Sequence, residues 1–255
     1  MKNFLQHPLA KNLDLDSPDA PSVHRQIIRS KPFLQNLYNE WYQSIVQHLP
    51  NHSEGKILEL GSGGGYLNAF IPNIITSDIQ LTKDVHLLLD AKELPFSTCS
   101  LDAIVMVDVF HHINDVDNFL QESIRCLNEK GKIIMVEPWI SAWSAVIYNK
   151  LHHEPCISES KQWSFPDTGP LSGANLALPW IVFKRDRKLF LDKYNELKIT
   201  AINLDWPFVY LLSGGVSMKT LVPEWTYPFF RKTELLLKPY MKYVAMFATI
   251  VLEKE

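Results

Sequence analysis

The chain is poor in cysteine and has no segment apolar enough to cross a membrane. Its 255 residues include three cysteines, widely spaced and without a Cys-x-x-Cys pair, so neither a disulfide framework nor a cysteine zinc site is predicted. No run of eighteen apolar residues occurs, and the amino terminus lacks the basic and apolar pattern of a secretory signal. We therefore expect a cytoplasmic protein with reduced thiols. Peripheral contact with a membrane stays open.

Basic residues are not in excess either. Lysine and arginine total 25 against 28 aspartates and glutamates, a net charge of −3, which gives no electrostatic footprint for nucleic acid. We therefore expect no nucleic-acid partner. A hydrophobic content of 46% and a charged content of 21% are ordinary for a globular protein. The chain is long enough to bury a sizeable core, and its oligomeric state stays open.

A glycine-rich break follows the first apolar segment. Residues 56–67, KILELGSGGGYL, run through Glu59 into four glycines at positions 61, 63, 64 and 65. The dinucleotide motif G-x-G-x-x-G fails because its sixth position is Tyr66, and no Gly-Lys-Ser/Thr of a P-loop follows. Glycine lets a backbone turn tightly and approach a ligand, and such a loop places the ligand at the carboxyl edge of a parallel sheet. A plain turn is the alternative interpretation.

Acidic residues follow at the ends of later segments. Residues 72–80 are predicted to form a second strand that ends in Asp78, where a carboxylate can accept both hydroxyls of a ribose. Asp78 could also be a simple turn residue. Ile79 could lie against an adenine face. Beyond the Asp90-Ala91 pair, the pattern predicts a strand at 103–107, a loop at 108–113, an amphipathic helix at 115–127 and a strand at 132–137.

This order of motifs resembles the class I S-adenosylmethionine-dependent methyltransferases of the type 11 family, over residues 55–138. The resemblance implies an α/β fold with a Rossmann-like seven-stranded sheet, mostly parallel with an antiparallel last strand, and helices on both faces. It implies S-adenosyl-L-methionine as cofactor, with Asp90 accepting the adenine amine. The cofactor-binding residues then expected are Glu59, Gly61, Ser62, Gly63, Gly65, Asp78, Ile79, Asp90, Ala91 and Val107.

We expect four regions along the chain. Residues 1–50 form an amino-terminal arm and cap helices, with residues 1–20 as a loose arm, Ser22 as a helix cap and a break at Pro32. Residues 51–138 form the cofactor-binding core. Residues 139–195 form an inserted substrate or lid region, because loops on a rigid scaffold carry function, and residues 196–255 supply the last strands. Three side chains of the cap helices are candidates to reach the methionine carboxylate: Arg25, Arg29 and Tyr42.

Two histidine pairs raise the question of a metal. They are His111-His112 and His152-His153, the second followed by Glu154. Imidazole and carboxylate are good ligands, but adjacent histidines cannot both face one metal from a regular strand, and no H-E-x-x-H motif occurs. We therefore predict no metal. His112 is instead a candidate base on the substrate side, with a structural role as the alternative.

The function implied is direct in-line methyl transfer to an oxygen or nitrogen of a small-molecule acceptor, without a covalent intermediate on the protein. The segments HHEP and PLSGANLALPWIVFKRDR are similar to methyltransferases of polysaccharide or lipopolysaccharide synthesis. The acceptor class is therefore a metabolite, a sugar or a lipid-linked glycan. Two alternatives stay open: a non-catalytic module that binds S-adenosylmethionine for regulation, and a nicotinamide oxidoreductase, which the glycine spacing disfavours.

Overall fold

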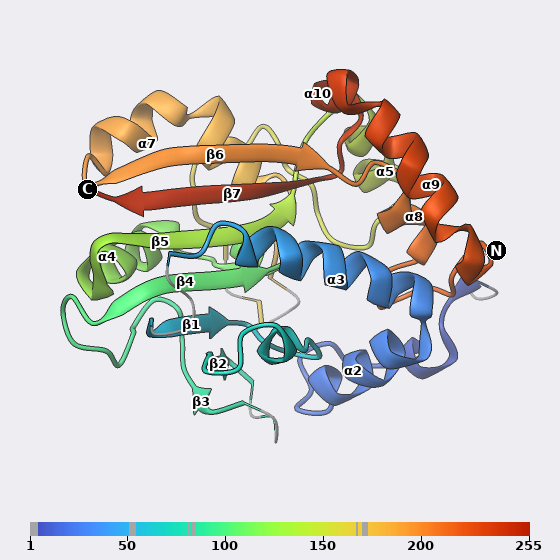
Figure 1. The fold of residues 1–255 in the computed structure, drawn as a ribbon, viewed down its shortest axis with the longest axis horizontal. Coiled ribbons are helices and arrows are strands. Elements are labelled where there is room, and N and C mark those ends of the chain that lie inside the picture. Colours follow the sequence, from blue (N-terminus) through green and yellow to red (C-terminus); the bar gives the residue numbers. More distant parts are fainter. Residues whose placement is uncertain (1–4, 51–54, 81, 83–84, 167, 170–172) are drawn as a thin grey trace.

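The computed structural model describes residues 5–50, 55–80, 82, 85–166, 168–169 and 173–255 (Figure 1). Parts of three regions expected from the sequence lie outside these described residues. They are residues 1–4 of the amino-terminal arm, residues 51–54, 81 and 83–84 of the cofactor-binding core, and residues 167 and 170–172 of the inserted region.

A seven-stranded sheet forms the centre of the protein, in the order β3-β2-β1-β4-β5-β7-β6. Its first five strands are parallel to one another, whereas β7 runs antiparallel to both β5 and β6. The fold class expected from the sequence is therefore confirmed. The strands are β1 (Ile57–Leu60), β2 (Ile75–Asp78), β3 (Leu87–Leu88), β4 (Leu101–Val107), β5 (Leu127–Pro138), β6 (Leu197–Asp205) and β7 (Phe247–Lys254).

The central strands are apolar on both sides because helices cover both faces of the sheet. Ile104 of β4 packs in one apolar cluster with Phe119 of α4 (Val116–Cys126). Val105, the next residue, points to the opposite face and joins a second cluster with Trp41 of α3 (Pro32–Val46). In Figure 1, α3 crosses in front of the sheet and α4 lies behind it. The alternation of side chains along each strand thus builds two cores on one sheet.

The amino-terminal region differs in two ways from the sequence expectation. Helix α2 (Ala20–Ser30) begins two residues before the expected cap Ser22, with Asp19 at its N-cap position, because Pro21 fits the first turn of a helix. From residue 5 onward, the arm before it is not loose. The backbone amide of His7 donates to Ser217 at 3.0 Å, and that of Lys219 donates to Leu5 at 2.7 Å. The arm therefore pairs with a segment more than 200 residues away. The predicted break at Pro32 is confirmed, since α3 begins there.

Two stretches of helix and loop follow the central strands. The first contains α5 (Ala142–Leu151), α6 (Leu178–Trp180), the π-helical turn η4 (Ile181–Arg185) and α7 (Arg187–Lys193). The second, between β6 and β7, contains α8 (Val209–Ser213), η5 (Glu224–Thr226), α9 (Tyr227–Leu236), η6 (Lys238–Tyr240) and α10 (Met241–Val244). Three further short 3-10 turns are η1 (Pro8–Ala10), η2 (Leu67–Ala69) and η3 (Phe110–His112). Among the described residues, no helix is long and apolar enough to cross a membrane.

Candidate active site

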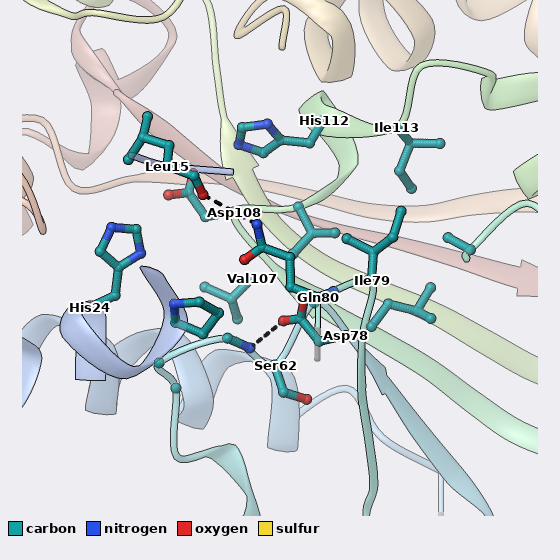
Figure 2. Close-up of a pocket in the computed structure, with 18 of the residues that line it drawn as sticks. Leu15, His24, Ser62, Asp78, Ile79, Gln80, Val107, Asp108, His112 and Ile113 are labelled. Carbon is teal, nitrogen blue, oxygen red and sulfur yellow. Dashed lines mark hydrogen bonds between the residues drawn. The ribbon is translucent and has the colours of Figure 1, made fainter. Parts of the chain in front are cut away.

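A cavity of about 350 Å³ opens at the carboxyl ends of β1, β2 and β4 (Figure 2). This is where ligands bind in open α/β sheets. The wall contains His112 and all ten residues named from the sequence as cofactor contacts. The structure therefore brings together in one place side chains that span 54 positions of the chain, from Glu59 to His112.

The glycine loop forms one wall of the cavity directly after β1. Gly61 and Gly63 both have positive φ, +62° and +45°, a region that residues with a Cβ adopt at a cost. The amide of Ser62 donates to the carbonyl of Ser77 at 2.8 Å, which ties the loop to β2. The Ser62 hydroxyl donates to Glu59 Oε2 at 2.8 Å. The loop is thus held from the strand side, and its other side faces the cavity.

Neighbouring glycines in this loop serve different purposes. A Cβ on Gly63 would have ordinary contacts, 3.7 Å from the carbonyl of Gly61 and 3.8 Å from the Asp78 carboxylate, so it would stand in the cavity without a clash. A Cβ on Gly64 would lie 2.5 Å from the backbone nitrogen of Arg25. Gly64 therefore allows α2 to pack on the loop, whereas Gly63 leaves the cavity wall bare.

Asp78 ends β2 and closes the loop from the side. Its Oδ2 accepts a hydrogen bond from the amide of Gly63 at 2.8 Å, and its Oδ1 accepts one from the amide of Gln80 at 2.9 Å. Burial raises the pKa of this carboxyl above its ordinary value, and the backbone donors oppose that rise. The amide of Ile79 is a third backbone donor to this carboxylate, which has about four acceptor positions and so retains one for a ligand. Sequence analysis gave Asp78 a ligand role; the structure adds that it orders the loop.

The remaining predicted contacts lie around the same cavity. Ile79 lines it with a side chain that is 47% exposed. Asp90 and Ala91 lie on the loop after β3, where Asp90 Oδ1 accepts a hydrogen bond from the amide of Lys92 at 2.9 Å. Val107 ends β4 and contributes an apolar patch to the wall. Apolar and acidic side chains therefore share the wall of the cavity.

The cap helices reach the loop as well. Arg25 of α2 donates from Nη2 to the carbonyl of Gly63 at 3.2 Å. The Tyr42 hydroxyl of α3 accepts a hydrogen bond from the amide of Tyr66 at 3.0 Å and lines the cavity. Arg29, the third candidate, is exposed and does not line it. The amino-terminal arm also takes part, because the carbonyl of Leu15 accepts a hydrogen bond from Gln80 Nε2 at 3.2 Å (Figure 2).

Opposite the glycine loop, a buried carboxylate organises the turn that carries the first histidine pair. Glu137, near the end of β5, is fully buried. Its Oε1 accepts hydrogen bonds from the amides of Val109 and Phe110, both at 2.8 Å. Its Oε2 lies 2.8 Å from His111 Nδ1. Because Oε1 already receives two donors and an ionised carboxylate only accepts, His111 donates its Nδ1–H to Oε2. The position of η3 is therefore fixed from β5.

The segment with the second histidine pair is clamped onto this turn. Asn175 connects the two, since its amide donates to the carbonyl of His111 at 2.9 Å and its Oδ1 accepts from the amide of Ile157 at 2.8 Å. The amide of Leu176 donates to the carbonyl of Pro155 at 3.0 Å. The motif HHEP and the segment GANLALPW, both after β5, thus meet in space although about 20 residues separate them.

Glu154 is the centre of the resulting cluster. Its carboxylate lies 3.5 Å from Nε2 of His111 and 3.8 Å from Nε2 of His112. The other pair approaches it too, with His152 Nδ1 at 3.8 Å and His153 Nε2 at 3.5 Å. Burial acts to raise the pKa of Glu154, but the surrounding histidines hold it well below its ordinary value. Glu154 is therefore an ionised carboxylate on the cavity wall.

His112 and Asp108 face the cavity from the same side (Figure 2). Burial, with the neighbouring charge of His111, lowers the pKa of His112 to about 4, so at neutral pH this imidazole is uncharged and a weak base. Asp108 has φ +60°, a strained conformation for a residue other than glycine. Desolvation by its surroundings raises the pKa of Asp108 to about 7. Its side chain is 37% exposed, and the exposed part faces the cavity.

Sequence analysis missed three members of this cluster as site residues: Asp108, Glu137 and Glu154. The signal that could have found Asp108 is its position directly after a fully apolar strand, the same position that drew attention to Asp78. Glu137 likewise follows a buried strand. Glu154 carried no such signal, because only the packing of α5 and Asn175 brings it to the cavity.

Comparison with known proteins finds a family match to part of the chain. Residues 58–135 match the family model described as a methyltransferase domain. The chain carries a methyltransferase domain. The matched region runs from β1 to β5 and so contains the glycine loop, Asp78, Asp90 and the first histidine pair. The resemblance to S-adenosylmethionine-dependent methyltransferases, and S-adenosylmethionine as their cofactor, are confirmed.

Solved structures of such methyltransferases share the fold. An S-adenosylmethionine-dependent methyltransferase from Thermotoga maritima, described as a possible histamine N-methyltransferase, is 17% identical over 86% of this chain and 89% of its own, with a TM-score of 0.51. Geranyl diphosphate C-methyltransferase from Streptomyces coelicolor, solved with Mg²⁺, geranyl diphosphate and S-adenosyl-L-homocysteine, is 12% identical over 98% of this chain and 90% of its own (TM-score 0.53).

A third structure is the complex of the Haloferax volcanii Trm112 methyltransferase activator with a methyltransferase. It is 12% identical over 87% of this chain and 91% of the matched chain, with a TM-score of 0.51. These identities establish a common fold and nothing finer. No curated protein matches the sequence.

Proposed function

We propose that this methyltransferase transfers a methyl group from S-adenosylmethionine, by direct in-line displacement, to an oxygen or nitrogen of a small molecule such as a metabolite, a sugar or a lipid-linked glycan. One observation carries the proposal. A side-chain-free loop with an ordered carboxylate and a cluster of carboxylates and histidines share a single cavity. The first set suits a nucleoside cofactor, and the second suits an acceptor that brings hydroxyl or amine donors.

The residues of the glycine loop side fit the cofactor. Gly63 offers a bare wall that a Cβ would fill, Asp78 has an acceptor position for a ribose hydroxyl, and Ile79 supplies an apolar surface for adenine. Asp90, on the same cavity wall, would accept the adenine amine. Glu59 supports the loop through Ser62. When bound, S-adenosylmethionine supplies an electrophilic methyl group on a sulfonium.

The other side of the cavity would hold the acceptor. Asp108 projects from the end of β4 into the recess, where it would accept a hydrogen bond from an acceptor hydroxyl or amine and orient it. His153 and Glu154 from the region 139–195 line the same side, which supports a substrate-binding role for that region. Orientation alone can lower the barrier of a two-reactant step by roughly 7–11 kcal/mol, so a chain that positions both reactants needs no covalent intermediate.

The base role considered for His112 has less support than orientation by Asp108. The carbonyl of Gly173 can only accept, so His112 donates its Nδ1–H to it at 2.9 Å. Its remaining lone pair, on Nε2, faces Glu154 rather than open cavity. Asp108, by contrast, presents a carboxylate oxygen to the recess.

The test has two parts. Calorimetric titration with S-adenosylhomocysteine should give one site per chain. Incubation with methyl-labelled S-adenosylmethionine and fractionated small-molecule extract, from cells that produce the protein, should then transfer label to a compound of low molecular mass. Asp78→Ala serves as the negative control for cofactor binding. Cofactor binding without transfer to any fraction would favour a regulatory module, and label found only in protein or nucleic acid would contradict the small-molecule acceptor.

A further inference from the structure

Three potential metal ligands converge at the wall of the cavity. Ligand atoms of His111, His112 and Glu154 all lie within 4.8 Å of one another. On a regular strand, His111 and His112 could not both face one metal, because adjacent side chains point to opposite sides. They lie instead on the 3-10 turn η3, where their ring centroids are 4.2 Å apart and both Nε2 atoms approach the same carboxylate.

In each ring, Nδ1 makes a hydrogen bond to a fixed partner. In an uncharged ring, that bond determines whether Nε2, the nitrogen that faces Glu154, carries a proton or a lone pair. His112 must donate from Nδ1 to the carbonyl of Gly173, so in the uncharged ring Nε2 bears a lone pair. This lone pair faces Glu154 Oε1 at 3.8 Å. A nitrogen acceptor and a carboxylate acceptor that face one another repel, and a cation between them would remove that repulsion. A proton on His111 would neutralise Glu154 but would leave this contact as it is.

The Nδ1 of His111 also has a fixed partner, in this case a carboxylate. Its Nδ1 donates to the buried carboxylate of Glu137 at 2.8 Å, and its Nε2 points to Glu154 Oε2 at 3.5 Å. Histidines that bind metals almost always donate their other ring N–H to a carboxylate or a backbone carbonyl, which fixes ring and tautomer. Here His111 has the carboxylate and His112 has the carbonyl.

The ligand atoms lie near enough for an ion of the zinc type after a small closure. Bonds of about 2.0–2.1 Å in a tetrahedral site place neighbouring ligand atoms about 3.3–3.4 Å apart. The two nitrogen–oxygen distances, 3.5 and 3.8 Å, run to different oxygens of Glu154. One ligand atom from each of the three residues lies within 4.8 Å of the others, so the side chains must close by up to about 1.5 Å to hold the ion. Two histidines and a glutamate are also the ligand set of one kind of catalytic zinc site, in which the fourth position is open.

We propose that His111, His112 and Glu154 bind a divalent transition-metal ion such as Zn²⁺ at the wall of the cavity. Because His112 and Glu154 line that cavity, the fourth position of the ion faces it. An oxygen of the acceptor can occupy this position. That role rests on the proposed function, whereas binding of the ion is independent of it.

The experiment titrates Zn²⁺ into the full chain, produced without a histidine tag and freed of metal by a chelator. A chromophoric competitor reports affinity and stoichiometry. We expect one site per chain in the wild type. Glu154→Gln, which keeps the shape and removes the charge, and His112→Gln should each weaken that site by roughly 100-fold or more, since even outer-shell partners of a metal contribute about 10–100-fold.

A matched control separates this site from general binding to histidines. His48 lies after α3, where its Nδ1 is 2.7 Å from the carbonyl of Ser44, and it does not line the cavity. His48→Gln should bind Zn²⁺ as the wild type does. Zn²⁺ should also raise the melting temperature of the wild type and of His48→Gln, but not that of Glu154→Gln, because a ligand stabilises only the folded state that binds it.

Absence of a site in the wild type, or equal affinity in Glu154→Gln, would overturn the proposal and leave protonated His111 as the partner of Glu154. Circular dichroism of each variant shows whether it is folded. Titration with S-adenosylhomocysteine is a separate measurement. A chain that binds zinc but not S-adenosylhomocysteine would support the metal site and contradict the proposed function. A chain that binds S-adenosylhomocysteine but not zinc would contradict the metal site and leave the proposed function standing.

Discussion

Adding a single methyl group at Gly63 tests how the glycine loop meets its ligand. In Gly63→Ala the new Cβ would lie 3.7 Å from the nearest backbone atom and 3.8 Å from the Asp78 carboxylate, both ordinary contacts. The substitution therefore fits the folded protein sterically. Its direct cost is the positive φ of +45°, about 1–2 kcal/mol for a residue with a Cβ.

The same methyl group would stand where the cofactor is proposed to approach. We expect the affinity for S-adenosylhomocysteine to fall by at least about tenfold, or 1.4 kcal/mol, because the ligand loses its contact with the backbone. The melting temperature should fall as well, by about 2–4 °C for each kcal/mol in a domain of this size. Calorimetric titration and thermal unfolding measure the two effects separately.

Gly215 provides a control with matched strain. Its φ is +53°, and a Cβ there would meet only the Tyr210 ring, at 3.8 and 4.0 Å. Gly215→Ala should therefore lose about as much stability as Gly63→Ala and retain the affinity of the wild type, since Gly215 does not line the cavity. Unchanged affinity in Gly63→Ala, or an equal loss in Gly215→Ala, would refute the assignment of the loop as the cofactor wall.

Three further predictions concern the same loop. Asp78→Ala should weaken S-adenosylhomocysteine binding by more than tenfold, because charge-assisted hydrogen bonds contribute about 1.5–3 kcal/mol; an unchanged calorimetric affinity would remove Asp78 from the site. Gly64→Ala should destabilise the fold by about 1–3 kcal/mol, since its Cβ would lie 2.5 Å from the backbone of α2, and wild-type stability in denaturant would contradict that packing. Burial raises the pKa of Glu59 from 4.5 to about 7, so the folded protein holds a proton that the unfolded chain releases between these values. Wild-type stability should therefore fall relative to Glu59→Gln as pH rises from about 4.5 to about 7, by on the order of 3 kcal/mol; parallel unfolding curves across this range would show that Glu59 is not desolvated.

The sequence by itself determined the sheet and the glycine-loop side of the cavity. Apolar runs specify buried parallel strands, and the carboxyl ends of such strands meet at one edge. Residues that follow a strand, such as Gly63, Asp78 and Asp90, therefore come together whatever the rest of the chain does. The glycine loop and Asp78 could be placed from such patterns, whereas the resemblance to methyltransferases supplied Asp90 and Ala91; all ten expected residues line the cavity.

Only the tertiary structure decided the other side. Glu154 reaches His111 through α5 and the clamp of Asn175, contacts between segments that no periodic pattern relates. The same holds for the amino-terminal arm, whose backbone pairs with residues 217–219. Hydrogen bonds between backbone groups cannot be predicted from the order of side chains. The charge state of a carboxylate or imidazole depends on neighbours that the packed fold brings close. Which groups face an acceptor is therefore set by the packed fold, whereas the cofactor side follows from the order of the strands.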